Sequence, residues 1–214
     1  MIDMPHATEA TMKSIVPGEL APRDAYNLML SVIIPRPIGW ISTVGADGTL
    51  NIAPYSFFNG VNGNPPMVMF SAARRRGGEI KDTLRNAQET GEFVVNIVDE
   101  TLAEAMNLTS GEFAYEVDEF ALAKLETARS IDVRPPRVAA APAALEARVH
   151  QIVPVEGTRS TIVIGQVLRY HVRVDLLRSS GLVDGSLLKP VARMGGDEYG
   201  TLGRVFSMRR PEVD

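Results

Sequence analysis

The sequence predicts a mainly β domain built on an antiparallel sheet, with few helices. Two segments, 145–153 and 161–174, alternate apolar and polar residues with a period of two. A hairpin signal lies earlier in the chain, where the apolar runs 38–44 and 50–53 flank Asp47-Gly48. Strands of a parallel sheet are buried on both faces, so this alternation indicates antiparallel strands with one buried and one polar face.

Further strands and three short helices complete the expected elements. The additional strand candidates are 67–71 and 93–98, and the helix candidates are 23–31, 83–90 and 101–108. The helix at 83–90 is expected to have Asp82 as its N-cap and to end at Gly91 in the left-handed conformation. The segment 127–142 is rich in proline and alanine, which predicts an extended connection.

Composition and charge exclude several classes of protein. The 214 residues are 45% hydrophobic, enough for one well-packed domain, and the net charge of −4 provides no general attraction to nucleic acid or anionic lipid. The chain has no cysteine, so disulfides, thiolate metal sites and a cysteine nucleophile are excluded. No apolar run reaches the length of a signal peptide or membrane span, so we expect a cytoplasmic protein with no nucleic-acid or membrane partner.

The usual short motifs of catalysis and phosphate binding are absent. The chain contains no Gly-x-Gly-x-x-Gly, no P-loop and no Gly-x-Ser-x-Gly nucleophile elbow. His6, His150 and His171 lack the spacing of a metal site, so no metal is expected. Any redox chemistry would therefore need a bound organic cofactor.

One segment has the character of an anion site. Lys81-Asp82-Thr83 stands at the start of the expected helix, where free backbone N–H groups and the positive end of the helix dipole favour a phosphate group. Ser71 and the run Arg74-Arg75-Arg76 precede it, so three guanidinium groups are candidates to converge on the same phosphate. The alternative is a capped surface helix beside a solvated basic loop.

A second segment combines aromatic, hydroxyl and amide side chains. Within 51–60, Tyr55, Ser56, Phe57 and Phe58 follow a strand and lead into an expected loop. Such a loop is suited to a flat heterocycle, because aromatic rings can cover its face while main-chain groups bond its polar edge. The alternative is a turn whose aromatic residues enter the hydrophobic core.

Several pieces of the sequence, taken in order, resemble one known family. They are Pro35 to Thr43, Asp47-Gly48, Asn51 to Phe58, Asn64 to Ser71, Lys81 to Thr83, Glu92 to Asn96, Asp118-Glu119-Phe120, Pro142 to Val149, Ile164 to Val167, and Arg193 to Gly196 with Tyr199. Over about residues 20–210 the chain resembles the flavin reductase-like family of FMN-binding split-barrel proteins.

The resemblance implies a fold, an assembly and a cofactor site. It implies a six-stranded antiparallel Greek-key split barrel with a few short helices, which forms a homodimer and binds FMN near the dimer interface. The implied contacts to the isoalloxazine ring and ribityl chain are Ser42, Thr43, Tyr55, Ser56, Phe57 and Phe58, and those to the phosphate are Ser71, Arg74, Lys81, Asp82 and Thr83. Trp40 either contacts the flavin or the partner subunit, or belongs to the core.

The resemblance also implies an activity without assigning a catalytic side chain. It implies an NAD(P)H:FMN oxidoreductase, with NADH or NADPH as electron donor, that supplies a flavin-dependent monooxygenase or another acceptor. Two alternatives remain, a flavoredoxin-like FMN electron-transfer protein and a flavin-free barrel that binds another phosphorylated ligand. His171 lies between Arg169 and Arg173 and is expected on a solvated strand face rather than at the cofactor.

The expected organisation has three parts. Residues 1–20 form an N-terminal arm, 21–175 form the barrel, and 176–214 form a C-terminal extension that packs on the barrel or on the dimer partner. The shorter reductases of the family end soon after the last barrel strand. An extension that covers the ring would favour electron carriage over rapid nicotinamide oxidation.

Overall fold

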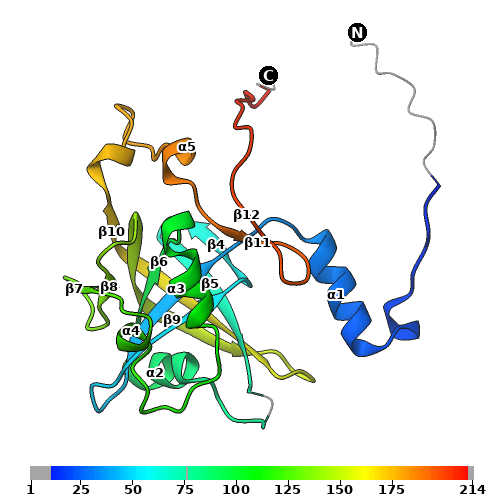
Figure 1. Cartoon of the computed structure of the whole chain (residues 1–214), viewed down its shortest axis with the longest axis horizontal. Coiled ribbons are helices and arrows are strands. Elements are labelled where there is room, and N and C mark those ends of the chain that lie inside the picture. Colours follow the sequence, from blue (N-terminus) through cyan, green and yellow to red (C-terminus); the bar gives the residue numbers. More distant parts are fainter. Residues whose placement is uncertain (1–10, 76, 212–214) are drawn as a thin grey trace.

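The computed structural model describes residues 11–75 and 77–211. Its centre is a seven-stranded antiparallel sheet with the strand order β3-β2-β6-β9-β10-β5-β4 (Figure 1). The strands are β2 (Gly39–Val44), β3 (Leu50–Tyr55), β4 (Phe58–Gly63), β5 (Pro66–Ala73), β6 (Glu92–Asn96), β9 (Ala143–Pro154) and β10 (Ser160–Val172). The sheet curls around a core, because Tyr55 of the edge strand β3 packs on Phe70 of β5 with ring centroids 5.0 Å apart.

Short helices and two small sheets surround this main sheet. The α-helices are α1 (Pro22–Val32), α2 (Asp82–Thr90), α3 (Ala103–Leu108), α4 (Glu119–Leu122) and α5 (Gly185–Leu188). The remaining strands are β1 (Arg36–Pro37), β7 (Thr127–Ala128), β8 (Arg137–Val138), β11 (Ala192–Arg193) and β12 (Tyr199–Gly200). Short 3-10 helices lie at Pro17–Glu19, Glu100–Leu102 and Val174–Leu176. Within the described ranges, no helix has the length and apolar character needed to span a membrane.

Two hydrophobic cores lie on the opposite sides of β2. The first fills the curled sheet and includes Ile41, Phe70 and Phe93. The second lies beneath α3 and α4 and includes Trp40 and Phe120. Trp40 is fully buried and its Nε1–H donates a 2.9 Å hydrogen bond to Thr109 Oγ1, so it is a core residue.

The periodic elements and the hairpin are confirmed. Gly48 has φ of 91° in the turn between β2 and β3, and Gly91 ends α2 with φ of 72° and a left-handed conformation. The prediction for Asp82 is wrong, because Lys81 occupies the N-cap position and Asp82 is the first helical residue. The expected loop at 51–60 is also wrong, because β3 and β4 occupy nearly all of it and only residues 56–57 join them.

The connection at 127–142 covers one face of the sheet. It contains β7 and β8, which pair with each other, so it is more structured than the expected extended segment. Glu146 of β9 is fully buried beneath it and accepts hydrogen bonds from the backbone N–H groups of Ile131 (2.8 Å) and Asp132 (2.5 Å). His171 Nε2 lies 2.5 Å from Glu146 Oε1, so the solvated face expected for His171 is wrong.

The C-terminal extension returns to the N-terminal side of the molecule. β11 pairs with β1 and with β12 in a three-stranded sheet, which brings residues 192–200 beside α1 (Figure 1). Arg36 of β1 joins these parts, because its guanidinium donates to the carbonyl oxygens of Ile33 (2.7 Å) and Met194 (2.6 Å). Residues 201–211 continue beyond this sheet and are exposed.

Candidate functional site

The first part of the candidate site is a small pocket at the start of α2. Lys81, Asp82 and Thr83 line it together with Tyr55 of β3 and Arg75. The first backbone N–H groups of a helix have no intrahelical acceptor, and the N-cap residue of α2, Lys81, makes no side-chain capping bond to them. Free N–H groups, the helix dipole and the Lys81 ammonium together suit an anion.

The Tyr55 hydroxyl adds a second observation at this pocket. Tyr55 is 5% exposed, and its hydroxyl makes no hydrogen bond with the described residues. Burial raises the pKa of Tyr55, the charges of Asp82 and Glu119 raise it further, and the nearby Thr83 hydroxyl opposes the rise. The Tyr55 side chain is therefore a neutral donor, and Lys81 Nζ lies 5.7 Å from the centre of its ring.

The basic run before α2 does not act as a single clamp. Arg75 forms an ion pair with Asp82 and donates a 2.6 Å hydrogen bond to the carbonyl oxygen of Phe113. The Arg74 side chain donates instead to the carbonyl oxygen of Gly78 at 3.1 Å, away from the pocket. Arg76 lies outside the described residues.

Glu119 is the other buried acidic group of the small pocket. It is the first residue of α4, and its Oε2 accepts a 3.3 Å hydrogen bond from the backbone N–H of Ile52. Burial raises the pKa of the Glu119 carboxyl to about 7, and the charges of Asp82 and Asp118 add to this rise. Glu119 is therefore substantially protonated near neutral pH.

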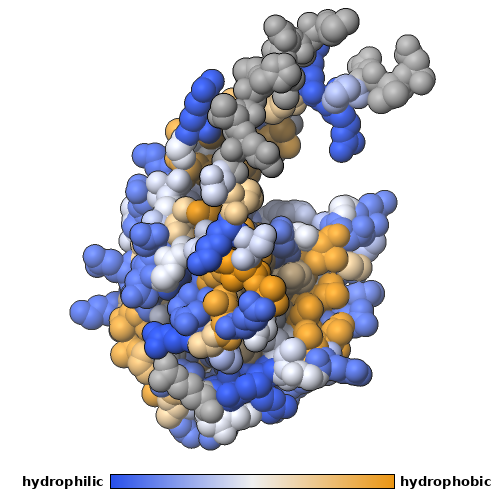
Figure 2. All heavy atoms as spheres, turned by 90° about the vertical axis from the view of Figure 1, so that its right-hand side faces the viewer, coloured by the Kyte–Doolittle hydropathy of each residue, from blue (hydrophilic) through white to orange (hydrophobic). Residues whose placement is uncertain are grey.

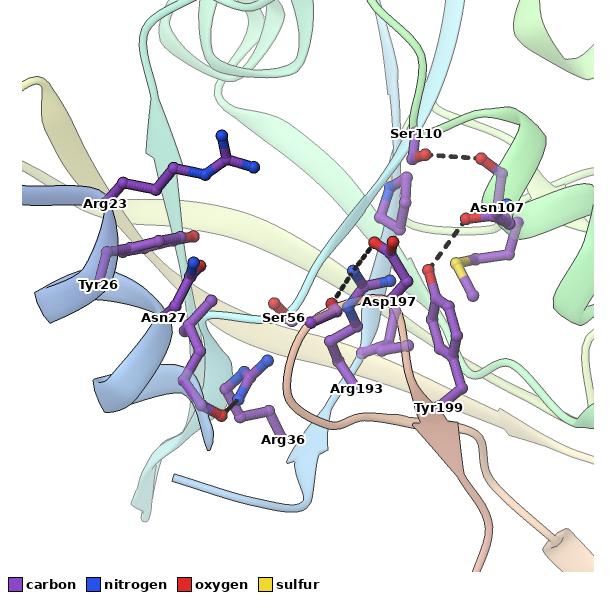
Figure 3. Close-up of a pocket in the computed structure, with 15 residues that line it drawn as sticks. Arg23, Tyr26, Asn27, Arg36, Ser56, Asn107, Ser110, Arg193, Asp197 and Tyr199 are labelled. Atoms are coloured by element: carbon purple, nitrogen blue, oxygen red, sulfur yellow. Dashed lines mark hydrogen bonds and ion pairs between the residues drawn. The ribbon is translucent and has the colours of Figure 1, made fainter. Parts of the chain in front are cut away.

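The second part of the site is a larger cavity of about 580 Å³. Pro54 and Ser110 line both this cavity and the small pocket, so the two adjoin. In Figure 3, Arg23, Tyr26 and Asn27 of α1 face Arg193, Asp197 and Tyr199 of the C-terminal turn across the cavity. The volume falls within the usual range for small-molecule sites, about 300–1,000 Å³.

Hydrogen bonds and stacking fix the C-terminal wall of the cavity. The Arg193 guanidinium lies 4.5 Å from the centre of the Tyr199 ring and donates a 2.6 Å hydrogen bond to the carbonyl oxygen of Gly196. The Tyr199 hydroxyl lies 3.0 Å from Asn107 Oδ1, which ties this wall to α3 (Figure 3). Burial lowers the pKa of Arg36, which also lines the cavity, and the Arg193 charge adds to this effect.

The structure brings together some of the residues predicted for the cofactor. Tyr55, Lys81, Asp82 and Thr83 line the small pocket, and Ser56 lines the larger cavity. Thr43 lies behind the small pocket, since Asn51 Nδ2 donates to the hydroxyls of both Thr43 (3.1 Å) and Thr83 (2.9 Å). It thus supports Thr83 from the protein interior.

The other predicted residues do not line these two pockets. Ser42 is buried and donates a 2.6 Å hydrogen bond to the carbonyl oxygen of Pro136. Phe58 packs against the barrel core, while Phe57 is exposed and its carbonyl oxygen accepts a 2.9 Å hydrogen bond from the Ser71 N–H. Arg74, as described above, points elsewhere.

Several lining residues had no predicted role. Tyr26 lies on α1, and Arg193, Tyr199 and Glu119 belong to pieces that supported the family resemblance without a function assigned to them. Only the resemblance itself offered a signal for these residues. Among the described residues, no group of His, Cys, Asp or Glu side chains is arranged to hold a metal ion.

Comparison with known proteins identifies the family. The model of the flavin reductase like domain matches residues 30–186. The structure is similar to nitrilotriacetate monooxygenase component B of Bacillus cereus, with 38% identity, a TM-score of 0.89, and coverage of 94% of this chain and 100% of that one. It is also similar to the 2-nitrobenzoate 2-nitroreductase NbaA of Pseudomonas fluorescens, with 28% identity, a TM-score of 0.84, and coverage of 93% and 96%.

A third structure confirms the fold class. A putative flavin reductase with a split barrel domain from Shewanella frigidimarina has a TM-score of 0.82 at 20% identity, and the alignment covers 91% of this chain and 96% of that one. The split barrel predicted from the resemblance is therefore present, with seven strands in its main sheet instead of six. By its sequence and its fold, the chain belongs to the flavin reductase-like family.

Proposed function

We propose that this protein is an FMN-binding flavin reductase that uses NADH or NADPH as electron donor. The observation that carries the proposal is the adjoining pair of pockets, one suited to a phosphate group and the other large enough for a flat ring system. FMN joins a ring and a phosphate through a ribityl chain, so one molecule would occupy both pockets. When bound, FMN supplies the hydride-accepting ring.

The chain's own residues have binding and orienting roles in this proposal. Lys81, Thr83 and the first N–H groups of α2 hold the phosphate. Ser56 and the C-terminal wall with Arg193 and Tyr199 position the ring. A flavin site requires no paired acid and base for the chemical step.

The phosphate assignment is tested by the affinity for FMN. Lys81→Ala should weaken FMN binding by about tenfold or more, because a charge-assisted hydrogen bond contributes about 1.5–3 kcal/mol. Flavin fluorescence titration measures this change. Riboflavin, which lacks the phosphate, should bind wild type and Lys81→Ala equally.

Matched variants make this test specific. Lys81→Arg should retain most of the FMN affinity, and Lys13→Ala, in the exposed N-terminal segment, should retain all of it. An unchanged FMN affinity in Lys81→Ala, or an equal loss for riboflavin, would contradict the phosphate assignment.

The activity is tested by nicotinamide oxidation in the presence of excess FMN. A reductase should consume NADH or NADPH rapidly, and its bound flavin should bleach under anaerobic conditions. A yellow protein with background consumption would support the flavoredoxin-like electron carrier instead. A colourless protein that does not bind FMN would contradict both and favour a different phosphorylated ligand.

We further propose that the protein is a homodimer and that its reduced flavin serves a separate monooxygenase or another acceptor. The similarity to a protein described as a monooxygenase component supports the second proposal. The homodimer is supported by α1, because none of its residues is buried in the single chain and Tyr26, Met29 and Val32 are exposed on it.

A further inference from the structure

The short helix α4 places one acidic side chain inside the small pocket. Asp118 caps the helix, because its Oδ1 accepts hydrogen bonds from the N–H groups of Phe120 (2.9 Å) and Ala121 (3.2 Å). Phe120 is buried in the second core and anchors the same turn. These contacts fix Glu119, which is 6% exposed, between β3 and the start of α2.

One oxygen of Glu119 is satisfied and the other is available. Oε2 accepts the hydrogen bond from the Ile52 N–H. The carboxyl also lies near its own backbone N–H, but Oε1 has no hydrogen bond to another described residue, and Glu119 lines the pocket. A protonated carboxyl at this position has an O–H available for a ligand.

No cation compensates a negative charge on Glu119. Among the described residues Glu119 has no ion pair, whereas its neighbour Asp82 pairs with Arg75 and lies 4.0 Å from Arg85. An ionised carboxylate without a partner is costly to bury, so the neutral form is favoured.

The protonation state of Glu119 determines the net charge of the pocket and therefore how favourably the pocket binds an anion. The pocket brings together two cations, Arg75 and the N-cap residue Lys81, and two acids, Asp82 of α2 and Glu112. Tyr55 of β3 faces the same space as a neutral phenol, and Asp118 adjoins Glu119 on its own helix. The formal charge of the pocket is thus balanced when Glu119 is protonated and negative when it is ionised.

We propose that Glu119 recognises the phosphate group in its protonated form, donating its O–H to a phosphate oxygen, so that binding takes up a proton. This inference rests on the proposed FMN site and assigns a role to the Asp118-Glu119-Phe120 piece of the sequence. A phosphate next to Glu119 stabilises the protonated carboxyl and repels the carboxylate. Affinity therefore falls as the pH rises above the pKa of the free protein.

The pH dependence of FMN affinity tests the inference on the full chain stripped of flavin. Between pH 7.0 and 8.5 the wild-type affinity should fall about tenfold, because the second ionisation of a phosphate monoester, near pH 6, is already complete. In Glu119→Gln the affinity should be the same at both pH values. Equal losses in wild type and Glu119→Gln would overturn the inference.

Two controls isolate the buried carboxyl and the phosphate. Glu112→Gln removes an exposed acid from the edge of the same pocket and should keep the wild-type pH dependence. Riboflavin binding to wild type should not weaken over this pH range, since riboflavin has no phosphate. A similar loss for riboflavin would assign the pH effect to the ring and contradict the inference.

A measurement on wild type alone covers the case in which Glu119→Gln does not fold. Calorimetric titration with FMN at pH 8.0, in two buffers of different ionisation enthalpy, should show proton uptake upon binding. Binding without proton uptake would overturn the inference and leave the FMN site intact. Absence of FMN binding at every pH would instead contradict the proposed function.

Discussion

Arg75 shows how a single side chain shapes the small pocket. It pairs with the buried Asp82 and also donates to the carbonyl oxygen of Phe113, so it joins α2 to the segment that closes the pocket. The Asp82 carboxylate neutralises the charge of Arg75. Lys81, the other cation that lines the pocket, forms no ion pair among the described residues. Arg75 is a structural element of the site and Lys81 is its candidate ligand-binding cation.

Replacement of Arg75 should therefore reduce stability. Arg75→Ala leaves the Asp82 carboxylate buried without its main partner and should lower the free energy of unfolding by about 2–4 kcal/mol. Chemical denaturation measures the loss. Arg74→Ala, which removes an exposed side chain, is the matched control and should change stability little. In the double variant Arg75→Ala/Asp82→Asn much of the loss should be recovered; additive losses would contradict the ion-pair explanation.

The part of the candidate site that can be predicted from the sequence is local in the chain. Lys81 and Thr83 were predicted because a helix start can be recognised from a few consecutive residues. Tyr26 and Arg193 line one cavity although they are far apart in the sequence, and their proximity depends on the pairing of β1 with β11. No local pattern encodes that pairing, so these residues were not predicted for the site.

At the scale of elements, α2 begins at the candidate anion site and ends at Gly91. Gly91 has φ of 72°, a left-handed conformation that disfavours other residues, and an added Cβ would meet no atom within 4 Å. Gly91→Ala should therefore lower the free energy of unfolding by about 1 kcal/mol through backbone strain alone. Gly60→Ala in β4 also meets no atom and has no positive φ, so it should be close to neutral. Equal effects in the two variants would contradict the backbone explanation.

There are physical reasons why some elements could not be predicted from the sequence. β4 contains Gly60, Asn62 and Gly63, residues with low strand propensity, and it forms because β5 provides a partner. The polar face of β9 and β10 was predicted to be solvated because alternation alone cannot reveal a covering segment. Glu146 is polar and still buried, since two backbone N–H groups of the covering segment satisfy its carboxylate.

At the scale of the whole molecule, two segments project from the rest of the chain and expose apolar side chains. α1 projects from the barrel and the chain beyond β12 extends away from it (Figure 1). Figure 2 shows apolar surface gathered on the side of the molecule that α1 occupies. Exposed apolar side chains are present on both segments: Tyr26, Met29, Val32, Val205, Phe206 and Met208. Apolar surface of this extent on projecting segments is typical of a subunit interface.

The exposed apolar residues of α1 predict that the protein is a dimer. Light scattering should give the mass of a dimer at micromolar concentration. Met29→Glu/Val32→Glu should shift the protein to monomers, because two charges replace exposed apolar side chains of α1 while helix propensity is maintained.

Ile131→Glu is the matched control for this prediction. Ile131 is an equally exposed apolar residue, 66% against 71% for Val32, and it lies in the segment that covers the sheet, away from α1. This variant should remain dimeric. α1 also lines the larger cavity, so a monomeric variant should bind flavin more weakly if the partner subunit completes the site. A wild-type monomer, or a dimer unaffected by the α1 charges, would contradict an interface at α1.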